Sequence, residues 1–329
     1  MSKISVTGDR PTGKLHLGHF VGSLQKRLEI QHTHQQFIMV ADIQALTGGI
    51  STQEVRKNVI DVMKDYLSVG LLPDLNTFCL QSAMPALHEI TCHYFNLVTL
   101  SRLLINPTIK QEANDKGYGN ALPMGFLCHP ISQAADITAL QADIVPVGED
   151  QKPLIEQTNE IVDKFSSLHG HGIVKRVNVL YGETPRLLGV DGNSKASKSL
   201  GNAIMLTDNS ETVKQKIWRM FTDPNHIKVS DPGTVEGNVV FHYLDVFYKN
   251  TPHLEQLKHD YRKGGLGDTT LKQLLFDTLE STLEEFRQRR ALVSDTQAID
   301  ILVEGTRKAN MVANKTLHSI REVMSFWDI

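Results

Sequence analysis

Two short polar segments, far apart in the chain, carry side chains that suit the binding of phosphate. Near the start, residues 7–19 read TGDRPTGKLHLGH and place His16 and His19 three residues apart. Far downstream, residues 195–199 read KASKS and supply Lys195 and Lys198. Imidazole and ammonium groups donate hydrogen bonds to anions, so the two segments together predict an enzyme that activates a substrate with ATP.

The first segment joins an expected strand to an expected helix. Residues 4–6 are predicted to form a short strand and residues 15–30 a helix, so the Gly/Pro-rich turn leads to a helix N-terminus, where backbone N–H groups favour phosphate. His16 and His19 share one face of that helix, and Gly18 leaves its backbone open to a flat ligand. This arrangement suits a nucleotide.

Other interpretations of these segments are open. Residues 8–14 have the spacing of a P-loop, but Leu15 stands where that motif needs a hydroxyl for magnesium. A zinc site is disfavoured because the two histidines lack a nearby third ligand, although they could simply be surface residues. Residues 192–201, predicted to be a mobile loop, could be a solvated cluster of charges. The presence of both segments in one chain disfavours unrelated surface histidines and a mere solvated cluster of charges.

The two segments resemble the signatures of one enzyme family. Residues 16–19, HLGH, resemble the HIGH signature of class I aminoacyl-tRNA synthetases, and residues 195–199 resemble their KMSKS signature. Residues 7–13, 133–137 and 143–151 are more narrowly similar to the bacterial tryptophan-specific branch of that family. The similarity extends over essentially the whole chain, including residues 231–233 and 305–310.

The chain also departs from the commoner pattern of that branch. His16 and His19 stand where many of its members have Thr and Asn, Gln133 replaces Met, and Ala196 replaces the signature methionine. These differences resemble a second bacterial subtype. They affect the expected side walls of the pocket, while the expected reaction stays the same.

Composition is consistent with a globular protein of about two domains. The 329 residues carry a formal net charge of −3, so a tRNA contact would need local patches such as Arg287, Arg289 and Arg290, which could equally be a solvated helix face. The three cysteines show no metal-binding spacing, so we expect reduced thiols and no metal site. No signal peptide or long apolar run is evident, and we expect a cytoplasmic protein without a membrane partner.

Apolar runs alternate with helical patterns in the first part of the chain. Strands are predicted over residues 37–42, 77–81 and 143–147, and helices over 51–67, where Ser51 and Glu54 form a capping box, and 86–104. This order predicts an α/β fold with a Rossmann-like, doubly wound parallel sheet. Ligands bind at the carboxyl ends of such strands, a position shared by Asp42, Gln44 and residues 148–150.

From about residue 210 onward there are no convincing strands, and helical periodicity predicts helices over residues 213–220, 271–293 and 298–324. We therefore expect a Rossmann-like catalytic domain over residues 1–205 and a mainly helical domain over residues 206–329. The resemblance implies that the helical domain binds the anticodon. It also implies a homodimer, joined around a connective region at about residues 71–122.

The resemblance implies a two-step reaction with L-tryptophan, ATP and tRNA(Trp). In the first step the tryptophan carboxylate attacks the α-phosphorus of Mg²⁺-bound ATP, giving tryptophanyl-adenylate and diphosphate. In the second step the tryptophanyl group passes to tRNA(Trp) with release of AMP. The magnesium ion would arrive with ATP, and no dedicated protein site for it is predicted.

Site residues follow from the same resemblance. The catalytic set is His16, His19, Lys195 and Lys198. The ATP-binding set is Arg10, Pro11, Thr12, Gly18, His19, Gly148, Glu149, Asp150, Leu187, Lys195, Ala196, Ser197, Lys198 and Ser199. The tryptophan-binding set is Asp136, Gln133, Gln151, Gln44 and Val6.

Within the tryptophan-binding set, Asp136 is expected to accept a hydrogen bond from the indole N–H. Phenylalanine would leave this carboxylate without a partner, which disfavours phenylalanine strongly. Alternatively, Asp136 only stabilises the first turn of its helix. Because a Gln followed three residues later by Asp also resembles the tyrosine-specific enzymes, tyrosine is the closest competing substrate. A small-molecule nucleotidyltransferase and a noncatalytic paralogue that binds amino acid or RNA are the remaining alternatives.

Overall fold

A computed structural model describes residues 2–47, 51–119, 121–148, 151–182, 187–192, 195–198 and 200–327. The chain forms two compact units, each assembled from separate stretches of sequence. The sheet unit comprises residues 1–13, 26–182 and 293–329, and the helical unit comprises residues 14–25 and 183–292. These units differ from a division at residue 205, because spatial contacts place an early segment in the helical unit and the final helix in the sheet unit.

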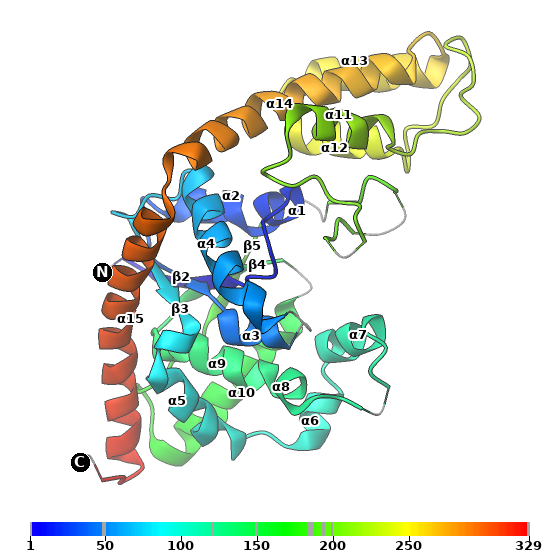
Figure 1. Cartoon of the computed structure of the whole chain (residues 1–329). Coiled ribbons are helices and arrows are strands. Elements are labelled where there is room, and N and C mark those ends of the chain that lie inside the picture. Colours follow the sequence, from blue (N-terminus) through cyan, green and yellow to red (C-terminus); the bar gives the residue numbers. More distant parts are fainter. Residues whose placement is uncertain are drawn as a thin grey trace. The chain divides into compact units, whose positions relative to one another are not determined.

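The sheet unit is built on five strands in the order β3-β2-β1-β4-β5, with all neighbouring strands parallel (Figure 1). The strands span Ile4–Asp9 (β1), Gln35–Val40 (β2), Asn76–Leu80 (β3), Ile144–Val147 (β4) and Asn178–Tyr181 (β5). β2 is buried along five successive residues, as expected for a strand covered on both faces. The predicted α/β class with a parallel sheet is confirmed. β5 was missed, since its four residues include no buried position.

The strand order reverses beside β1, and this is where the predicted ligand crevice should lie. The Thr7 hydroxyl donates to the Pro146 carbonyl over 3.3 Å and ties β1 to β4. Open α/β sheets bind ligands outside the carboxyl ends of strands at such a reversal. Arg10 and Gly148 directly follow the ends of β1 and β4. Two of the predicted ATP-binding residues therefore lie at the expected edge of the sheet.

The helices of the sheet unit pack on either side of its strands or against other helices of the unit. They are α2 (Gln25–Ile30), α3 (Asp42–Leu46), α4 (Thr52–Ser68), α5 (Pro85–Phe95), α6 (Leu100–Leu104), α7 (Pro107–Asp115), α8 (Met124–Leu127), α9 (His129–Ala139), α10 (Lys152–His169) and α15 (Asp295–Val323), with a 3₁₀ turn, η2, at Gln81–Ala83. Proline lies in the first turn of α5, α7, α9 and α10, where its missing N–H leaves no helical bond unmade. The helix predicted over 86–104 is divided into α5 and α6.

The predicted capping box at Ser51 and Glu54 is wrong, although a helix does begin there. The Ser51 hydroxyl contacts the side chain of Gln53 at 3.3 Å and caps no backbone N–H of α4. The motif identified the start of the helix because Ser and Glu suit a helix N-terminus. It did not determine which partner the hydroxyl takes.

The final helix, α15, lies against the edge strand β3 and helix α5 (Figure 1). A Cβ atom added to Gly305 would lie 2.0 Å from the Phe78 carbonyl oxygen, so the helix and strand backbones meet directly. The Leu80 N–H, in turn, donates to the Thr306 hydroxyl over 3.0 Å. Only a glycine permits this approach. Helical periodicity predicted α15 but could not show that it belongs with the sheet.

The helical unit consists of an early segment and a later run of helices. Its elements are α1 (Leu17–His19), a π-helical turn, η1, at Phe20–Leu24, α11 (Ser210–Trp218), α12 (Val239–Phe247), α13 (Thr251–Lys263) and α14 (Asp268–Leu292). The helix predicted over residues 15–30 is thus interrupted by the π turn. Helices α12 and α13 were not among the predicted elements.

Backbone pairing and a ring contact join the early segment to the rest of the helical unit. The Leu17 N–H donates to the Ile204 carbonyl over 2.9 Å, and the Leu206 N–H donates to the Leu15 carbonyl over 3.0 Å. The Phe20 and Phe286 rings pack with centroids 5.2 Å apart. Residues 14–25 are therefore held by partners that lie near residue 205 and in α14.

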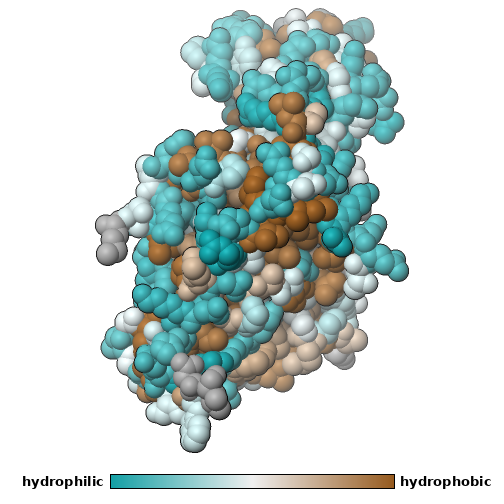
Figure 2. Space-filling view, turned by 60° about the vertical axis from the view of Figure 1, so that its left-hand side comes forward, coloured by the Kyte–Doolittle hydropathy of each residue, from teal (hydrophilic) through white to brown (hydrophobic). Residues whose placement is uncertain are grey.

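In the part of the chain that the structure describes, no helix is both long and apolar enough to span a membrane. The face shown in Figure 2 is a mixture of hydrophilic and apolar residues, with the apolar ones gathered in separate groups. Such groups are ordinary on protein surfaces unless they form a large continuous patch.

Candidate active site

The two predicted histidines lie together at the start of α1 in the helical unit. His16 is the N-cap residue, and its Nδ1 accepts from the Gly18 N–H at 3.0 Å. The His19 Nδ1 accepts from the His16 N–H at 3.3 Å, and the two ring centroids are 3.9 Å apart. Because both Nδ1 atoms accept, each neutral ring carries its proton on Nε2. Both Nε2 atoms are therefore donors, as a phosphate oxygen requires.

Gly18 is required by the packing of the histidine pair. A Cβ atom at this position would lie 2.8 Å from the His16 ring and 3.6 Å from the Cβ of Ala196. The glycine was predicted to leave room for a ligand, and the structure gives a second reason for it. The contact with Ala196 also shows that the HLGH segment and the lysine loop, residues 187–202, meet within one unit.

A single buried amide organises the described part of the lysine loop. Asn202 is only 3% exposed, and its Oδ1 accepts from the Ser197 N–H at 2.8 Å. Its Nδ2 donates to Asp191 Oδ1 over 3.1 Å and to the Lys195 carbonyl over 3.3 Å. Sequence reasoning missed Asn202, because nothing in its local pattern separates it from other polar loop residues.

Two side chains of α12 also bind the backbone of the lysine loop. The Tyr243 hydroxyl donates to the Leu188 carbonyl over 2.7 Å, and His242 Nε2 accepts from the Leu188 N–H at 3.3 Å. Burial raises the pKa of Tyr243, so its hydroxyl stays protonated and able to donate. The predicted mobile loop, residues 192–201, thus adjoins a segment that is well connected to α12. Within the lysine loop, the Leu187 carbonyl accepts from the Ala196 N–H at 3.1 Å.

Part of the predicted ATP-binding set lies outside the described residues. Glu149, Asp150 and Ser199 belong to this group. Gly148 is described, and its carbonyl accepts from the Gln151 N–H at 3.1 Å at the start of α10.

A buried carboxylate, Asp136, lies on α9 in the sheet unit. It is 6% exposed, and its Oδ2 accepts from the side-chain amides of Gln81 at 2.8 Å and Gln44 at 3.3 Å. Its Oδ1 is fully buried, and no donor among the described residues reaches it. Burial raises the pKa of Asp136 to about 7, against the lowering effect of the Gln81 hydrogen bond. Oδ1 of Asp136 is therefore able to accept a hydrogen bond from a ligand.

Gln133 presents a second acceptor one helical turn before Asp136. Its Oε1 is also buried without a donor among the residues that the structure describes. Residues three apart share a helix face, so the two open oxygens lie on the same side of α9. Two buried acceptors without partners on one face make this side of α9 a candidate binding site for a ligand that donates hydrogen bonds.

The other predicted tryptophan-binding residues are placed differently. The side-chain amide of Gln44 lies against Asp136. Val6 lies in the hydrophobic core at 3% exposure. Gln81, the strongest partner of Asp136, was not predicted as a site residue. The available signal was that Gln81 ends the predicted strand 77–81. Asp42 and Gln44 had been noted because they lie at the carboxyl end of another predicted strand.

Basic side chains gather beyond the carboxyl end of β1. Arg10 lies 3.6 Å from Glu112, and Lys116 Nζ donates to the Thr47 carbonyl over 3.0 Å. Burial, assisted by the charges of Arg10 and Lys116, lowers the pKa of His129 to about 3, so its ring is neutral. An anion would relieve the repulsion among these groups. Of the neighbouring predicted residues, Pro11 is buried and Thr12 is exposed.

The arginines considered for tRNA binding lie on α14. Arg287 donates to the Asp208 carbonyl over 2.9 Å and forms ion pairs with Glu280 and Glu284. Arg289 pairs with Glu285 at 2.7 Å. These acidic partners neutralise much of the local charge, which favours the interpretation of this stretch as a paired helix face.

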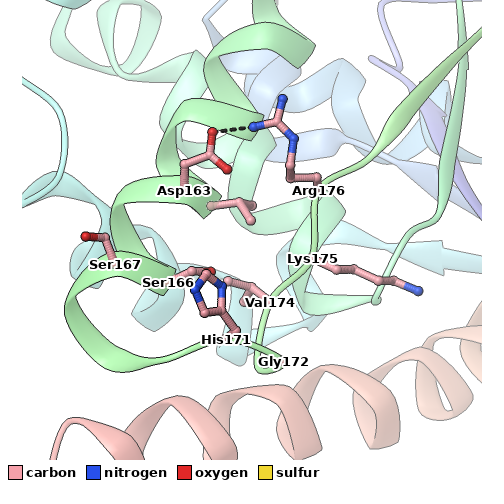
Figure 3. A pocket seen from close by; sticks show the side chains of 9 residues that line it. Asp163, Ser166, Ser167, His171, Gly172, Val174, Lys175 and Arg176 are labelled. Carbon is pink, nitrogen blue, oxygen red and sulfur yellow. Dashed lines mark hydrogen bonds and ion pairs between the residues drawn. The ribbon is translucent and has the colours of Figure 1, made fainter.

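A surface cavity of about 670 Å³ lies elsewhere in the sheet unit, between α10 and the segment 171–176 (Figure 3). The cations on its lining are paired, Arg176 with Asp163 and Lys175 with Asp143. None of the predicted site residues lines it. Concavity alone therefore does not identify the functional site of this chain.

Comparisons with known proteins point to one family. The model for class I tRNA synthetases (W and Y) matches residues 2–284. The tryptophan–tRNA ligase of Clostridium longisporum is 50% identical over 329 residues, covering 98% of this chain and 96% of that protein. The tryptophan–tRNA ligase of Streptococcus mutans serotype c is 48% identical over 335 residues, covering 98% of each.

Solved structures give the same result. The tryptophanyl-tRNA synthetase from Campylobacter jejuni, complexed with ADP and tryptophan, superimposes with a TM-score of 0.85 at 25% identity and covers 98% of this chain and 100% of that chain. The tyrosyl-tRNA synthetase from Archaeoglobus fulgidus, complexed with L-tyrosine, has a TM-score of 0.69 at 22% identity, with 88% and 90% coverage. The second likeness establishes only a common fold.

Proposed function

Because this chain belongs to the class I tRNA synthetases of the tryptophan and tyrosine (W and Y) family, we propose that it acts as a tryptophan–tRNA ligase. It activates L-tryptophan with ATP to tryptophanyl-adenylate and diphosphate. It then transfers the tryptophanyl group to tRNA(Trp) and releases AMP. The full-length identity of about one half to tryptophan–tRNA ligases supports this function over the alternatives.

One structural observation carries the choice of amino acid. Asp136 offers a buried carboxylate oxygen without a donor, and the indole N–H of tryptophan is a donor that has no acceptor character. Phenylalanine would enter the same pocket and leave the carboxylate without a partner, which sites of this kind reject strongly. Gln133, Gln44, Gln151 and Val6 complete the proposed tryptophan site.

The activation step uses the residues of the helical unit. His16 and His19 donate through Nε2 to the α-phosphate, where negative charge develops, and Lys195 and Lys198 neutralise the β- and γ-phosphates. Phosphoryl chemistry of this kind requires positioning and charge neutralisation more than covalent help. Mg²⁺ arrives with ATP. The remaining proposed nucleotide contacts are Arg10, Pro11, Thr12, Gly18, Gly148, Glu149, Asp150, Leu187, Ala196, Ser197 and Ser199.

Transfer to tRNA implies a larger assembly. We assign catalysis to residues 1–205 and anticodon binding to residues 206–329 as functional regions, although the compact units are divided differently. A homodimer forms around residues 71–122. Support comes from Leu100, Leu104 and Ile105, three large apolar side chains that stand exposed on and beside α6. The enzyme works in the cytoplasm, where its tRNA is found.

Amino-acid-dependent exchange between ATP and pyrophosphate tests this function directly. Purified protein with Mg²⁺ is assayed in parallel with tryptophan, tyrosine, phenylalanine and each other amino acid. Exchange with tryptophan alone, followed by charging of tRNA(Trp), is the expected result. Exchange with tyrosine alone would retain the chemistry and overturn the amino-acid assignment. A protein that exchanges with no amino acid would be the noncatalytic paralogue instead.

A further inference from the structure

We propose that Gln81 is a specificity-determining residue, because its amide holds Asp136 in the orientation that leaves only Oδ1 available to the substrate. This inference rests on the proposed function, in which Asp136 accepts from the indole N–H. Gln81 itself does not touch the substrate. It is a positioning residue that acts through the carboxylate.

The contacts of Gln81 fix its amide at both ends. Its Nε2 donates to Asp136 Oδ2 over 2.8 Å, and its Oε1 accepts from the Gln44 N–H at 3.3 Å. The side chain is 1% exposed and lies at η2, directly after β3. A glutamine amide has one orientation in which both bonds form. The rotamer of Gln81 is therefore determined by α3 on one side and α9 on the other.

Gln44 adds a second, weaker contact to the same oxygen. Its Nε2 reaches Asp136 Oδ2 at 3.3 Å, so two amides converge on Oδ2 while none reaches Oδ1. A carboxylate oxygen has two lone pairs, so Oδ2 has its full complement of donors. A ring N–H that enters the site must therefore take Oδ1. This asymmetry is the physical basis of the proposed role.

The amides also provide the stabilisation that a cation usually gives a buried carboxylate. No Lys, Arg or His among the described residues forms an ion pair with Asp136. The neighbouring ionisable group on β3 is Cys79, whose pKa is raised by burial and by Asp136, so it is a neutral thiol. Asp42, at the start of α3, accepts from the Ser82 N–H at 2.9 Å. Loss of the Gln81 donor should thus raise the pKa of Asp136 further from its ordinary value.

The test compares tryptophan with β-(3-benzothienyl)-L-alanine, an isostere that has sulfur in place of the ring N–H. The ratio of kcat/KM for the two substrates is measured by pyrophosphate exchange in wild type, Gln81→Met and the matched control Gln157→Met. Gln157 is another buried glutamine of the sheet unit. Its Oε1 accepts from the Asn106 side-chain amide at 2.8 Å and takes no part in the hydrogen bonds of Asp136. Gln81→Met should lower the ratio about tenfold, as expected for one charge-assisted hydrogen bond, and Gln157→Met should leave it unchanged.

Two further readouts separate positioning from a general structural defect. The acidic limb of the kcat/KM profile for tryptophan should move to higher pH in Gln81→Met, while the profile of the isostere should show no matching displacement of an acidic limb. Gln44→Met should produce the same changes on a smaller scale, which keeps the proposal testable if Gln81→Met fails to fold. Equal losses for both substrates with an unmoved limb would overturn the proposal.

Titration of the free protein distinguishes this inference from the proposed function. The Asp136 carboxyl is followed by ¹³C NMR in aspartate-labelled protein and assigned by its absence in Asp136→Asn. A higher pKa in Gln81→Met supports the control of Asp136 by Gln81 even if tryptophan proves not to be the substrate. An unshifted pKa would overturn the inference, whatever the wild-type protein activates.

Discussion

The two ends of the proposed reaction are built by different means. The tryptophan end, on α9 of the sheet unit, depends on side-chain amides that meet at a buried carboxylate. The nucleotide end, in the helical unit, depends on short-range backbone bonds that orient two imidazoles and on one asparagine that connects the lysine loop. The first arrangement suits the choice of a substrate, and the second suits the stabilisation of developing charge. Selectivity and rate should therefore respond to different mutations.

Asp136→Ala should give the largest effect and should confine it to selectivity. Without the buried acceptor, phenylalanine is no longer penalised, and the ratio of kcat/KM for tryptophan over phenylalanine should fall by on the order of 10⁴. The KM for ATP should stay near its wild-type value. Pyrophosphate exchange with both amino acids measures the ratio. The control is Asp163→Ala on α10, whose partner is Arg176. An unchanged ratio would remove Asp136 from the tryptophan site.

His19→Ala should show the opposite pattern. Loss of one donor to the α-phosphate should lower kcat by about 10²–10³ for every amino acid, with the tryptophan to phenylalanine ratio preserved. His32→Ala, which removes an exposed histidine, is the matched control. Thermal melting checks that α1 survives the loss of the His19 contact to the His16 backbone. A change in amino-acid selectivity would contradict the division of labour between the two clusters.

Acidification should weaken the tryptophan end. With a pKa of about 7, Asp136 is about one-tenth ionised at pH 6, so kcat/KM for tryptophan should fall roughly tenfold between pH 8 and pH 6. The sulfur isostere has no N–H to place and should show no such fall. Parallel pH profiles of the two substrates measure the difference, and coincident profiles would exclude Asp136 as their source.

The same group makes the opposite contribution to folding. Its pKa in the folded protein lies above the value near 3.9 of an exposed Asp, so the folded state binds the proton more tightly than the unfolded state. Its contribution to stability should consequently decline as pH rises from about 4 to about 7. Ionisation of Asp136 therefore favours tryptophan binding but lowers the stability of the folded protein.

Gly305→Ala should have the smallest effect on either cluster and tests the scaffold of the sheet unit. The added methyl group would collide with the Phe78 carbonyl oxygen, and overpacking of this kind costs about 1–3 kcal/mol in the free energy of unfolding. Chemical denaturation measures the loss, with Gly22→Ala, where an added Cβ meets nothing within 4 Å, as control. Unaltered selectivity and kcat at low temperature are expected. A large change in either would show that α15 is coupled to the site.

The sequence indicated those parts of the candidate site that consist of local patterns. His16, His19, Lys195 and Lys198 were proposed from two motifs, and Asp136 from resemblance. Gln81 and Asn202 were not predicted because their contacts form only on folding. Gln81 donates to the carboxylate of Asp136, 55 residues away in the chain. Asn202 forms hydrogen bonds with Asp191, Lys195 and Ser197. Their own segments contain no periodicity that marks them.

The fold was predictable to a similar extent. Strands β1 to β4 follow from apolar runs, whereas β5 is short and only half-buried, and the predicted hydroxyl cap at Ser51 is not formed. The placement of α15 could not be inferred from its own amphipathic pattern. That placement depends on the close approach of Gly305 to a strand that lies far away in the sequence.

The position of α15 has a consequence for the newly made chain. β3 is an edge of the sheet, and edge strands readily pair with other chains unless something covers them. Here α15 covers β3, and its Thr306, which accepts from the Leu80 N–H, lies 226 residues after Leu80 in the chain. At a synthesis rate of about 5–20 residues per second, the ribosome needs roughly 10–45 s to deliver it. For that interval the growing polypeptide carries an open strand, and a ribosome that stalls before α15 would release a chain prone to aggregate through β3.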